Sequence, residues 1–332
     1  MRFDQPLSAE AMTHVMTSLM AGQLPEDEVR TFLVTLAKRG ETAEEIAAAV
    51  HVLRQHAVAL PLTRSYDDLC DTCGTGGDGQ GTFNISTLAA LVASAAGVRV
   101  VKHGNRAASS RCGSADLVEA LGLNLEASPA QIARGIEEVG FGFCFAPRFH
   151  PAMNVVAPIR KALGIRTIFN LIGPLANPAP LTYQLVGVAE TRLLRPMAEA
   201  LVRLGIRHGM VVRGRDGLDE VTTTTTTEAL EIRAGNITEH LLDPDTLGVR
   251  RATLEALRGG DAAHNARLAQ EVLAGTPSSL RDIIVLNAGC AIYLAERAPT
   301  IAEGMVLADR AIQSGAARQQ LDRVKEYSLH VG

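Results

Sequence analysis

The segment from Gly74 to Thr87, GTGGDGQGTFNIST, constrains the fold of this chain more than any other. It holds five glycines and runs directly into the apolar stretch from Leu88 to Ala96. Glycines let the backbone adopt positive φ and approach a ligand closely, and the N–H groups that open the next helix point at an anion. We therefore predict a phosphate-binding loop between a strand and a helix, although a glycine-rich loop can also be a simple turn. Its spacing is neither that of a dinucleotide loop nor that of a nucleotide-triphosphate loop, which needs a Lys.

A basic cluster follows about one strand-and-helix step later. The chain reads KHGNRAASS over residues 102–110 and then GSAD over residues 113–116, which opens a helix-like run. The β-branched stretch from Val98 to Val101 predicts a short buried strand, so the cluster lies at the carboxyl end of that strand. Ligands of open α/β sheets bind at this end. We expect an anion site here, with a solvated basic turn as the alternative.

An acidic segment occupies a similar place later in the chain. Asp219 and Glu220 end the sequence DGLDE, which follows a strand-like stretch over residues 208–213. Magnesium binds through one or two carboxylates together with ligand phosphates, so adjacent carboxylates at a strand end suit it. An isolated pair of this kind is more often part of a solvated loop. Two phosphate-type loops in the same chain favour the metal site.

The N-terminal part of the chain predicts a separate helical unit. Apolar residues recur at helical spacing in three segments, and Thr42 with Glu45 forms a capping box sequence. Strands alternate with helices only from about Asp68 onward, and Pro61 is a candidate boundary. At 332 residues the chain exceeds one ordinary domain. We therefore expect an α/β protein, with a small all-helical domain over residues 1–66 and a larger α/β domain with a mainly parallel central sheet.

Composition limits the partners and the location. The net charge of −4 argues against nucleic acid, and the basic residues gather locally, as a small anionic ligand requires. The sequence shows no uncharged apolar stretch of membrane-spanning length and no signal peptide, so we expect no membrane partner and a cytoplasmic location. Cys70 and Cys73 form a CxxC that could be a redox pair or half of a zinc site. Without a second CxxC, packing is the better interpretation.

Several longer motifs carry a family resemblance. They include KHGNR, GSADLVEALG, GFGFCFAPRFHPAM, GIRTIFNLIGPLANP and LRGGDAAHN, in addition to GTGGDG and DGLDE. In this order they resemble the anthranilate phosphoribosyltransferases, Mg²⁺-dependent glycosyltransferases of tryptophan biosynthesis. The resemblance implies the fold type of nucleoside phosphorylases and phosphoribosyltransferases. It also implies that residues 150–182 join the helical domain, that residues 67–149 and 183–332 form the large domain, and that helices of the small domain make homodimer contacts.

The resemblance further implies a set of site residues. Phosphoribosyl diphosphate would be bound by Gly74, Gly77, Asp78, Thr82, Asn84, Ile85, Ser86, Thr87, Lys102, His103, Gly104, Asn105, Arg106, Ala107, Ala108, Ser109, Ser110 and Ser114. Anthranilate would contact Gly74, Asn105, His150 and Arg160. Mg²⁺ would be held by Ser86, Asp219 and Glu220, and the catalytic residues would be Lys102, Asn105 and Arg160.

The chemistry of these residue types agrees with that reaction. Displacement of diphosphate from ribose C1 builds negative charge on the leaving group, which Mg²⁺, Lys102 and helix N-termini would stabilise. An aromatic amine is already a neutral nucleophile, so positioning matters more than base catalysis. The planar guanidinium of Arg160 can bind a carboxylate bidentately, although an Arg on a helix, here expected over residues 151–163, is usually a surface charge.

Two other functions are compatible with these motifs, and one segment differs from the family pattern. A pyrimidine nucleoside phosphorylase also works at ribose C1, and a non-catalytic binding protein could keep the same fold. The six threonines from Thr222 to Thr227 depart from the family pattern beside the acidic pair. β-Branching predicts an extended segment with solvated hydroxyls there.

Overall fold

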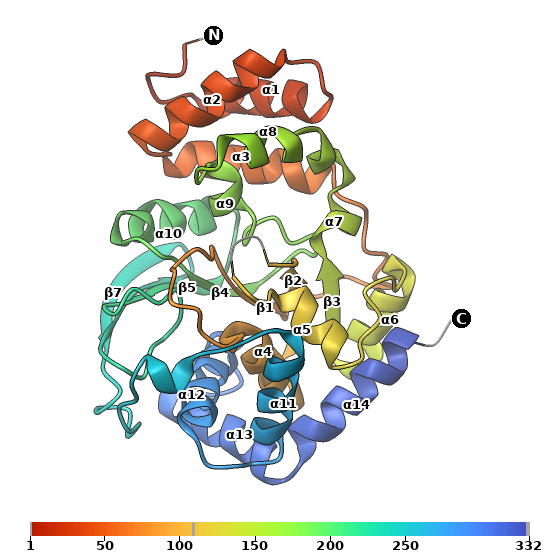
Figure 1. The fold of residues 1–332 in the computed structure, drawn as a ribbon, viewed down its shortest axis with the longest axis vertical. Helices are drawn as coiled ribbons and strands as arrows, with labels where there is room; N and C mark the ends of the chain where they lie inside the picture. The colour runs from red at the N-terminus through yellow and green to blue at the C-terminus, as the bar shows by residue number, and fades with distance from the viewer. Residues whose placement is uncertain (1, 108–109, 330–332) are drawn as a thin grey trace.

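The computed structural model describes residues 2–107 and 110–329, which form a helical unit stacked on an α/β unit. Figure 1 shows α1, α2, α3, α8 and α9 together at the top, the sheet across the middle and the C-terminal helices below it. The expected α/β class with a small helical domain is confirmed. The two units meet along one face of the sheet, and the candidate site residues lie near that junction.

Three amphipathic helices begin the chain. Each places its apolar residues on one buried face, as Met12, Met16 and Leu19 do in the first helix. The predicted capping box of Thr42 and Glu45 is present at the start of the third helix, and Gly40 follows the last residue of the second. The bounds are α1 Ala9–Met20, α2 Glu26–Arg39 and α3 Ala43–Gln55.

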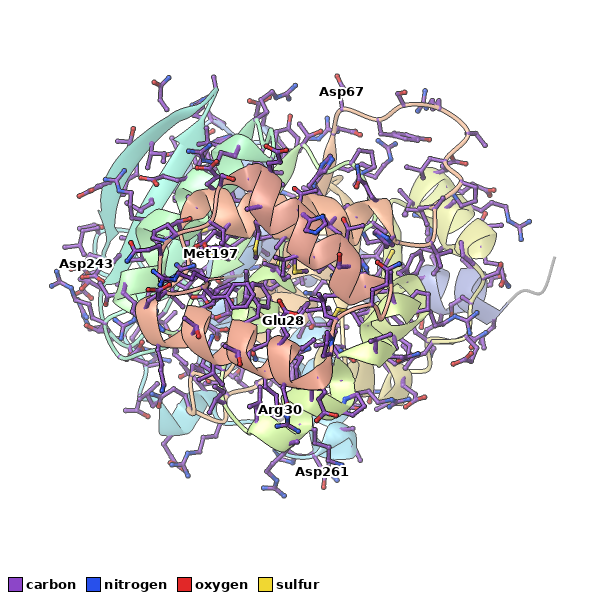
Figure 2. The ribbon with its side chains drawn as sticks, turned by 90° about the horizontal axis from the view of Figure 1, so that it is seen from above. Glu28, Arg30, Asp67, Met197, Asp243 and Asp261 are labelled. Atoms are coloured by element: carbon purple, nitrogen blue, oxygen red, sulfur yellow. The ribbon has the colours of Figure 1, made fainter. Side chains whose placement is uncertain are left out.

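A later segment returns to these helices. It contains α7 Ala146–Phe149, the 3₁₀ helix η1 Pro151–Val155, α8 Ala157–Leu163 and α9 Ile168–Ile172. Helix α9 packs on α3, α8 packs on α2, and η1 contacts α1. Figure 2 looks down on α1 and α2, with Met197 of α10 (Leu194–Arg203) behind them, and Met197 belongs to the same hydrophobic cluster.

The expected continuous helix over residues 151–163 is wrong. The structure has η1, then a break at Val156, and then α8. Pro158 explains the break, because it lacks a backbone N–H and its ring would clash with the carbonyl four residues earlier in a continuous helix. In the first turn of a new helix the same proline is tolerated. Met153, Asn154, Ala157 and Arg160, on either side of the break, line the pocket described below.

The described residues form one seven-stranded sheet in the order β3-β2-β1-β4-β5-β6-β7. Strands β1 to β5 are parallel, β6 pairs antiparallel with β5, and β7 pairs antiparallel with β6. The carboxyl ends of β1, β2 and β4 therefore lie side by side. The bounds are β1 Leu69–Gly74, β2 Arg99–Gly104, β3 Phe141–Phe145, β4 Tyr183–Gly187, β5 His208–Gly214, β6 Thr227–Arg233 and β7 Asn236–Leu242.

Helices cover both faces of the sheet. Helix α10 and the helical unit cover one face, and α4 and α12 are central to the other, as Figure 1 shows. The remaining helices extend this second layer or cap its edge. Their bounds are α4 Ile85–Ala95, α5 Ser114–Ala120, α6 Pro129–Val139, α11 Ala262–Leu273, α12 Ser279–Leu294, α13 Ile301–Gln313 and α14 Ala316–Leu329, with short 3₁₀ helices η2 Thr191–Leu193 and η3 Glu255–Leu257.

The cysteines of the CxxC lie on opposite faces of β1. Cys70 belongs to the hydrophobic cluster around α4 and α12, and Cys73 belongs to the cluster beneath the helical unit. All five cysteines of the described chain are buried and free. Burial raises the pKa of the Cys73 thiol well above its usual value. These features agree with a packing role for both residues.

The length and hydropathy of the helices bear on whether any of them could cross a membrane. Across residues 2–107 and 110–329, no helix is both long enough and apolar enough to cross a membrane.

Candidate active site

A cavity of about 440 Å³ lies where the carboxyl ends of β1 and β2 meet the helical unit. Its walls come from both units, since the sheet side supplies the glycine-rich loop and the KHGN segment, and the other side supplies residues of η1, α8 and α9. Ten of the residues predicted from sequence line it. These are Gly74, Ser86, Lys102, His103, Gly104, Asn105, Arg106, Ser114, His150 and Arg160.

Asp219 is packed against two glycines. A Cβ atom on Gly74 would lie 2.3 Å from Asp219 Oδ2, and one on Gly187 would lie 1.6 Å from the Asp219 carbonyl oxygen. Neither position can carry a side chain without displacing the acidic segment. The Asp219 carboxylate also accepts a hydrogen bond from the Gly76 N–H at 2.7 Å. The glycine-rich loop and the acidic segment are thus directly in contact.

Glu220 reaches the start of α4. Its Oε1 accepts the Ser86 N–H at 3.1 Å, which places the carboxylate at the positive end of the helix. Burial is the main cause that raises the pKa of Glu220, and the neighbouring Asp219 adds to it. Burial likewise raises the pKa of Asp219 to about 6, with Asp78 as the second cause. Two half-buried carboxylates side by side are therefore costly to ionise without a nearby cation.

Lys102 supplies one such cation. It is 2% exposed, and its Nζ donates a hydrogen bond to the Thr72 carbonyl. Strand β2 continues to Gly104, so Lys102 and His103 lie within the strand. The shorter strand expected from Val98 to Val101 would have placed both residues after its end. The positive charge of Lys102 opposes the upward shift in the pKa of Glu220.

Behind Lys102, a buried carboxylate holds the end of β2. Asp71 Oδ2 accepts from Asn177 Nδ2 at 2.9 Å, and Asn177 Nδ2 also donates to the Val101 carbonyl at 2.7 Å. Burial raises the pKa of Asp71, which the charge of Lys102 partly offsets. Sequence reasoning assigned no role to Asp71 or Asn177, although Asn177 lies within the quoted motif GIRTIFNLIGPLANP, next to its last residue.

The segment after β2 is bent around one serine. Ser114 Oγ accepts the Asn105 N–H at 3.1 Å and lies 3.2 Å from the Asn105 carbonyl oxygen, to which it donates. Arg106 turns away to pair with Asp116 and Glu119. These contacts leave Asn105 in the cavity wall with its backbone fixed. Of the predicted residues in this segment, Ala108 and Ser109 lie outside the described residues.

Two histidines form a buried part of the wall. The rings of His103 and His150 meet edge to face with centroids 5.2 Å apart. His103 Nδ1 lies 3.2 Å from the Gly173 carbonyl oxygen, so this nitrogen carries the proton and donates. Burial, followed by the nearby His150, lowers the pKa of His103 to about 3. Burial also lowers the pKa of His150. Both imidazole rings are therefore uncharged at neutral pH.

Arg160 faces the cavity from α8. Its guanidinium lies over the Phe169 ring at 5.3 Å from the centroid, and burial lowers its pKa. No acidic side chain among the described residues contributes to that pKa. The next residue, Lys161, is exposed to solvent. The structure thus separates two neighbouring cations into one that lines the cavity and one that does not.

The other predicted residues lie around the cavity without lining it. The side chain of Asn84 is already hydrogen-bonded to other residues of the protein. Its Nδ2 donates to the Cys112 carbonyl at 3.0 Å, and its Oδ1 accepts from Asn265. Thr82 pairs with Arg258 through a backbone bridge. Described residues in this group are Gly77, Asp78, Thr82, Asn84, Ile85, Thr87, Ala107, Ser110, Asp219 and Glu220.

Sequence reasoning missed several contributors. Arg166 Nη1 donates to the Gly76 carbonyl at 2.9 Å and so holds the glycine-rich loop from the helical unit. Asn154 and Asn170 line the cavity opposite the sheet, as do Met153 and Phe169. Their motifs were recognised, but nothing in their spacing indicates which side chains face the cavity.

The threonine run differs from its expectation. Thr222, Thr223 and Thr227 are fully buried, and only Thr227 belongs to a strand. The Thr222 hydroxyl donates to Asp216 Oδ2 at 2.6 Å, so it is not solvated. A nearby carboxylate and close packing on α12 override the β-propensity of the segment. The extended, solvated interpretation is therefore wrong.

The acidic residues fit a divalent cation that also contacts a ligand. Across the described chain, no cluster of three or more His, Cys, Asp or Glu side chains is placed to hold a metal on its own. Two half-buried carboxylates with raised pKa values beside a glycine-rich loop are the donor set that Mg²⁺ uses when phosphate oxygens complete its shell.

Comparisons with known proteins agree with this architecture. Residues 2–57 match the helical bundle domain of a glycosyl transferase family, and residues 66–318 match the a/b domain of that family. An anthranilate phosphoribosyltransferase of Thioalkalivibrio sulfidiphilus is 47% identical over 97% of this chain and 95% of its own length. One from Rubrobacter xylanophilus is 48% identical over 96% of this chain and 93% of its own.

Solved structures are similar as well. The anthranilate phosphoribosyltransferase of Thermus thermophilus superposes with a TM-score of 0.92 at 47% identity, covering 98% of this chain and 97% of that chain. The Saccharomyces cerevisiae enzyme in complex with PRPP and Mg has a TM-score of 0.89 at 30% identity, covering 97% and 93%.

The fold and the site define a two-domain glycosyltransferase whose cavity lies between a helical bundle and the carboxyl edge of a sheet. Relatives with 44–48% identity over nearly the whole chain then give the narrower assignment. The chain belongs to the anthranilate phosphoribosyltransferase family.

Proposed function

We propose that this protein transfers the 5-phosphoribosyl group from phosphoribosyl diphosphate to the amine of anthranilate and releases diphosphate. One observation carries the proposal most directly. A single cavity brings the glycine-rich loop and Lys102 on one side to an unpaired guanidinium, that of Arg160, on the other. One end therefore suits phosphates, and the other suits an aromatic carboxylate.

The phosphate end would bind phosphoribosyl diphosphate. Backbone N–H groups of the glycine-rich loop, the start of α4 and the segment from Lys102 to Ser114 offer donors to the diphosphate and the ribose phosphate. The family's set of residues, Gly74 through Thr87 and Lys102 through Ser114, stays a proposal for this chain. Asn84 would act by holding the loop, since its own side chain is bonded to protein.

The acceptor end would bind anthranilate. Arg160 can pair bidentately with its carboxylate, and the Phe169 ring beneath the guanidinium limits how that group can turn. Gly74 and Asn105 would contact the substrate near the reacting amine, and His150 would line its approach. The uncharged rings of His103 and His150 avoid a competing cationic site for the carboxylate.

Mg²⁺ would be held by Asp219, Glu220 and Ser86 with the substrate phosphates. The relatives' own complex with PRPP and Mg supports metal use in this class of enzyme. Bound there, the cation would neutralise charge on the departing diphosphate. It would also balance two carboxylates that burial otherwise disfavours.

The chain's own residues would act mainly through charge and position. The amine nitrogen would attack ribose C1 as the bond from C1 to the diphosphate oxygen breaks, and the nitrogen would then lose one proton to solvent or to the departing diphosphate. Negative charge would grow on the diphosphate, which Lys102 can stabilise. The buried ammonium is already fixed on the Thr72 carbonyl and needs little reorganisation. Arg160 and Asn105 would hold the amine on line with C1.

Assembly and domain limits stay part of the proposal. We propose a small domain of residues 1–66 with 150–182 and a large domain of residues 67–149 with 183–332. A homodimer formed through the helical domain and a cytoplasmic location remain predictions from the sequence.

A direct assay tests the function. Purified protein with anthranilate, phosphoribosyl diphosphate and Mg²⁺ should consume anthranilate, followed as loss of its fluorescence, with one diphosphate released per anthranilate. A chelator should stop the reaction. Folded protein that shows no turnover would contradict the proposal.

A second arm addresses the phosphorylase alternative, which the comparisons do not favour. Pyrimidine nucleosides with inorganic phosphate should give no free base, since the acceptor end offers Arg160 to a carboxylate that these nucleosides lack. Release of base at a rate comparable to anthranilate consumption would favour the alternative.

A further inference from the structure

Asp219 and Glu220 lie inside a short loop, and the carboxylate of Asp216 is hydrogen-bonded to both ends of this loop. Asp216 precedes the pair, and its Oδ1 accepts the Leu218 N–H at 3.0 Å. Its Oδ2 accepts the Thr222 hydroxyl at 2.6 Å and also the Thr224 hydroxyl. Leu218 stands directly before Asp219, and Thr222 follows two residues after Glu220. The contacts of Asp216 therefore span the whole acidic segment.

Further contacts close the loop from outside. The Thr224 N–H donates to Thr222 Oγ1 at 3.0 Å, and the Thr222 N–H donates to Thr227 Oγ1 at 3.0 Å. The side chain of Asn287 in α12 makes two hydrogen bonds to the backbone of the intervening Val221. Its Oδ1 accepts the Val221 N–H at 3.1 Å, and its Nδ2 donates to the Val221 carbonyl at 2.8 Å. The threonine run is thus a folded support and not a solvated tail.

The same carboxylate is enclosed by backbone. A Cβ atom on Gly214 would lie 2.2 Å from Asp216 Oδ1 and 3.0 Å from Thr222 Cγ2. Thr222 is fully buried. Gln80 of the glycine-rich loop donates to the Asp216 carbonyl at 3.2 Å, so the support also touches the phosphate loop. Asp216 consequently has little freedom to change partners.

We propose that Asp216, Thr222 and Thr224 form a clasp that positions Asp219 and Glu220 for a divalent cation. These are positioning residues, because none of them lines the cavity. The inference rests on the proposed metal site and names what holds the loop that carries its two carboxylates. Hydrogen bonds that orient metal ligands typically affect metal affinity by about 10–100-fold. Removal of the two hydroxyls should therefore weaken cation binding more than it disturbs the fold.

The test uses isosteric variants of the full chain. Thr222→Val with Thr224→Val removes both hydroxyls from Asp216, and Thr222→Ser with Thr224→Ser keeps them. Thr225→Val is the matched control, since the Thr225 side chain takes no part in the clasp. Binding of Mn²⁺ in the presence of inorganic diphosphate, followed by electron paramagnetic resonance, reads metal affinity without the aromatic substrate. Thermal unfolding without metal reads stability.

The double valine variant should bind Mn²⁺ about 10-fold more weakly than the wild type. The double serine variant and Thr225→Val should both retain wild-type affinity. In the transfer assay, excess Mg²⁺ should restore much of the kcat of the valine variant. When the double variant does not fold, the single variants Thr222→Val and Thr224→Val should each weaken Mn²⁺ binding by less than the full effect.

Three results would overturn the clasp. Wild-type Mn²⁺ affinity in a folded double valine variant would make the threonines merely structural. Equal weakening by Thr225→Val would remove the specificity of the contacts. A wild-type protein that binds no Mn²⁺ with diphosphate would end both the clasp and the metal site. By contrast, a protein that binds Mn²⁺ as expected but consumes no anthranilate would overturn the proposed function alone.

Discussion

The backbone N–H of Ser86 donates to the Glu220 carboxylate at 3.1 Å, although 134 positions separate the two residues. A parallel contact joins Gly76 to Asp219 at 2.7 Å. Asp219 is therefore bonded to the glycine-rich loop, and Glu220 is bonded to the first turn of α4. A change in either segment should alter metal binding and phosphate binding together.

Neutralising the acidic pair should impair metal use and leave the fold intact. Asp219→Asn with Glu220→Gln should raise the Mg²⁺ concentration for half-maximal activity by at least about 10-fold, since loss of a ligand exceeds loss of an outer hydrogen bond. Without metal, thermal stability should stay equal or rise, because burial makes both carboxylates costly to ionise. Activity against Mg²⁺ concentration and thermal unfolding measure the two effects.

The control for that variant is Asp67→Asn. Asp67 is exposed on the connection between α3 and β1, at the edge of the view in Figure 2. It should keep the wild-type Mg²⁺ dependence. Wild-type activity of the double variant at limiting Mg²⁺ would remove these carboxylates from the metal site.

Replacing Arg160 should affect the aromatic substrate selectively. Arg160→Ala should raise the KM for anthranilate by about 10-fold or more and scarcely change that for phosphoribosyl diphosphate, because a charge-assisted contact contributes about 1.5–3 kcal/mol. Arg160→Lys should fall between wild type and Ala, since a point charge restores attraction but not the planar fork. Steady-state kinetics with each substrate varied at saturation of the other measure this.

Lys161→Ala is the neighbouring control for Arg160. Lys161 is exposed and does not line the cavity. Its variant should leave both KM values unchanged. An equal rise of both KM values in Arg160→Ala, or an anthranilate effect in Lys161→Ala, would place the carboxylate elsewhere.

Glu231 should make stability depend on acidic pH. Its hydrogen bond from His208 is the main cause that lowers its pKa from 4.5 to about 2, and Tyr293 also donates to it. A carboxyl group whose pKa is lower in the folded protein stabilises the fold at pH values above its pKa in the unfolded chain. This stability is lost as pH falls from about 4.5 toward 2. Glu231→Gln should therefore lower the free energy of unfolding by on the order of 2 kcal/mol at pH 6.

Urea unfolding of both proteins at pH 6 and pH 3 checks the sign. The difference between wild type and Glu231→Gln should shrink at pH 3. Glu239→Gln, which loses only an exposed pair with Arg195, should cost less than about 1 kcal/mol at either pH. A Glu231→Gln difference that grows on acidification would refute the assignment.

The thiols should be unreactive in the native protein. Burial raises the pKa values of Cys70, Cys73 and Cys144, and thiolate is the reactive form. An aromatic disulfide reagent should modify almost no thiol within minutes in native buffer and all five in denaturant. Rapid native modification of Cys70, Cys73 or Cys144 would contradict their burial.

Local signals in the sequence were enough to predict the main architecture. The capping box at Thr42, the apolar periodicity of the first three helices and the β-branched stretch from Val98 to Val101 depend on residues close together in the chain. They could therefore be recognised there, although the strand extends to Gly104. The prediction of one continuous helix over residues 151–163 was wrong because Pro158 interrupts the helix, and the helical spacing of the apolar residues does not reveal this interruption.

The sequence by itself determined which chemical groups this protein brings to a site: glycines that free a loop, Lys102, Arg160 and an adjacent carboxylate pair. Only the tertiary structure decided which of them share a cavity and what holds them. Glu220 became a partner of the Ser86 N–H, and Arg166 of the Gly76 carbonyl, through the packing of distant segments. Such contacts depend on strand order and burial, which join residues far apart in the chain, and no local spacing records them.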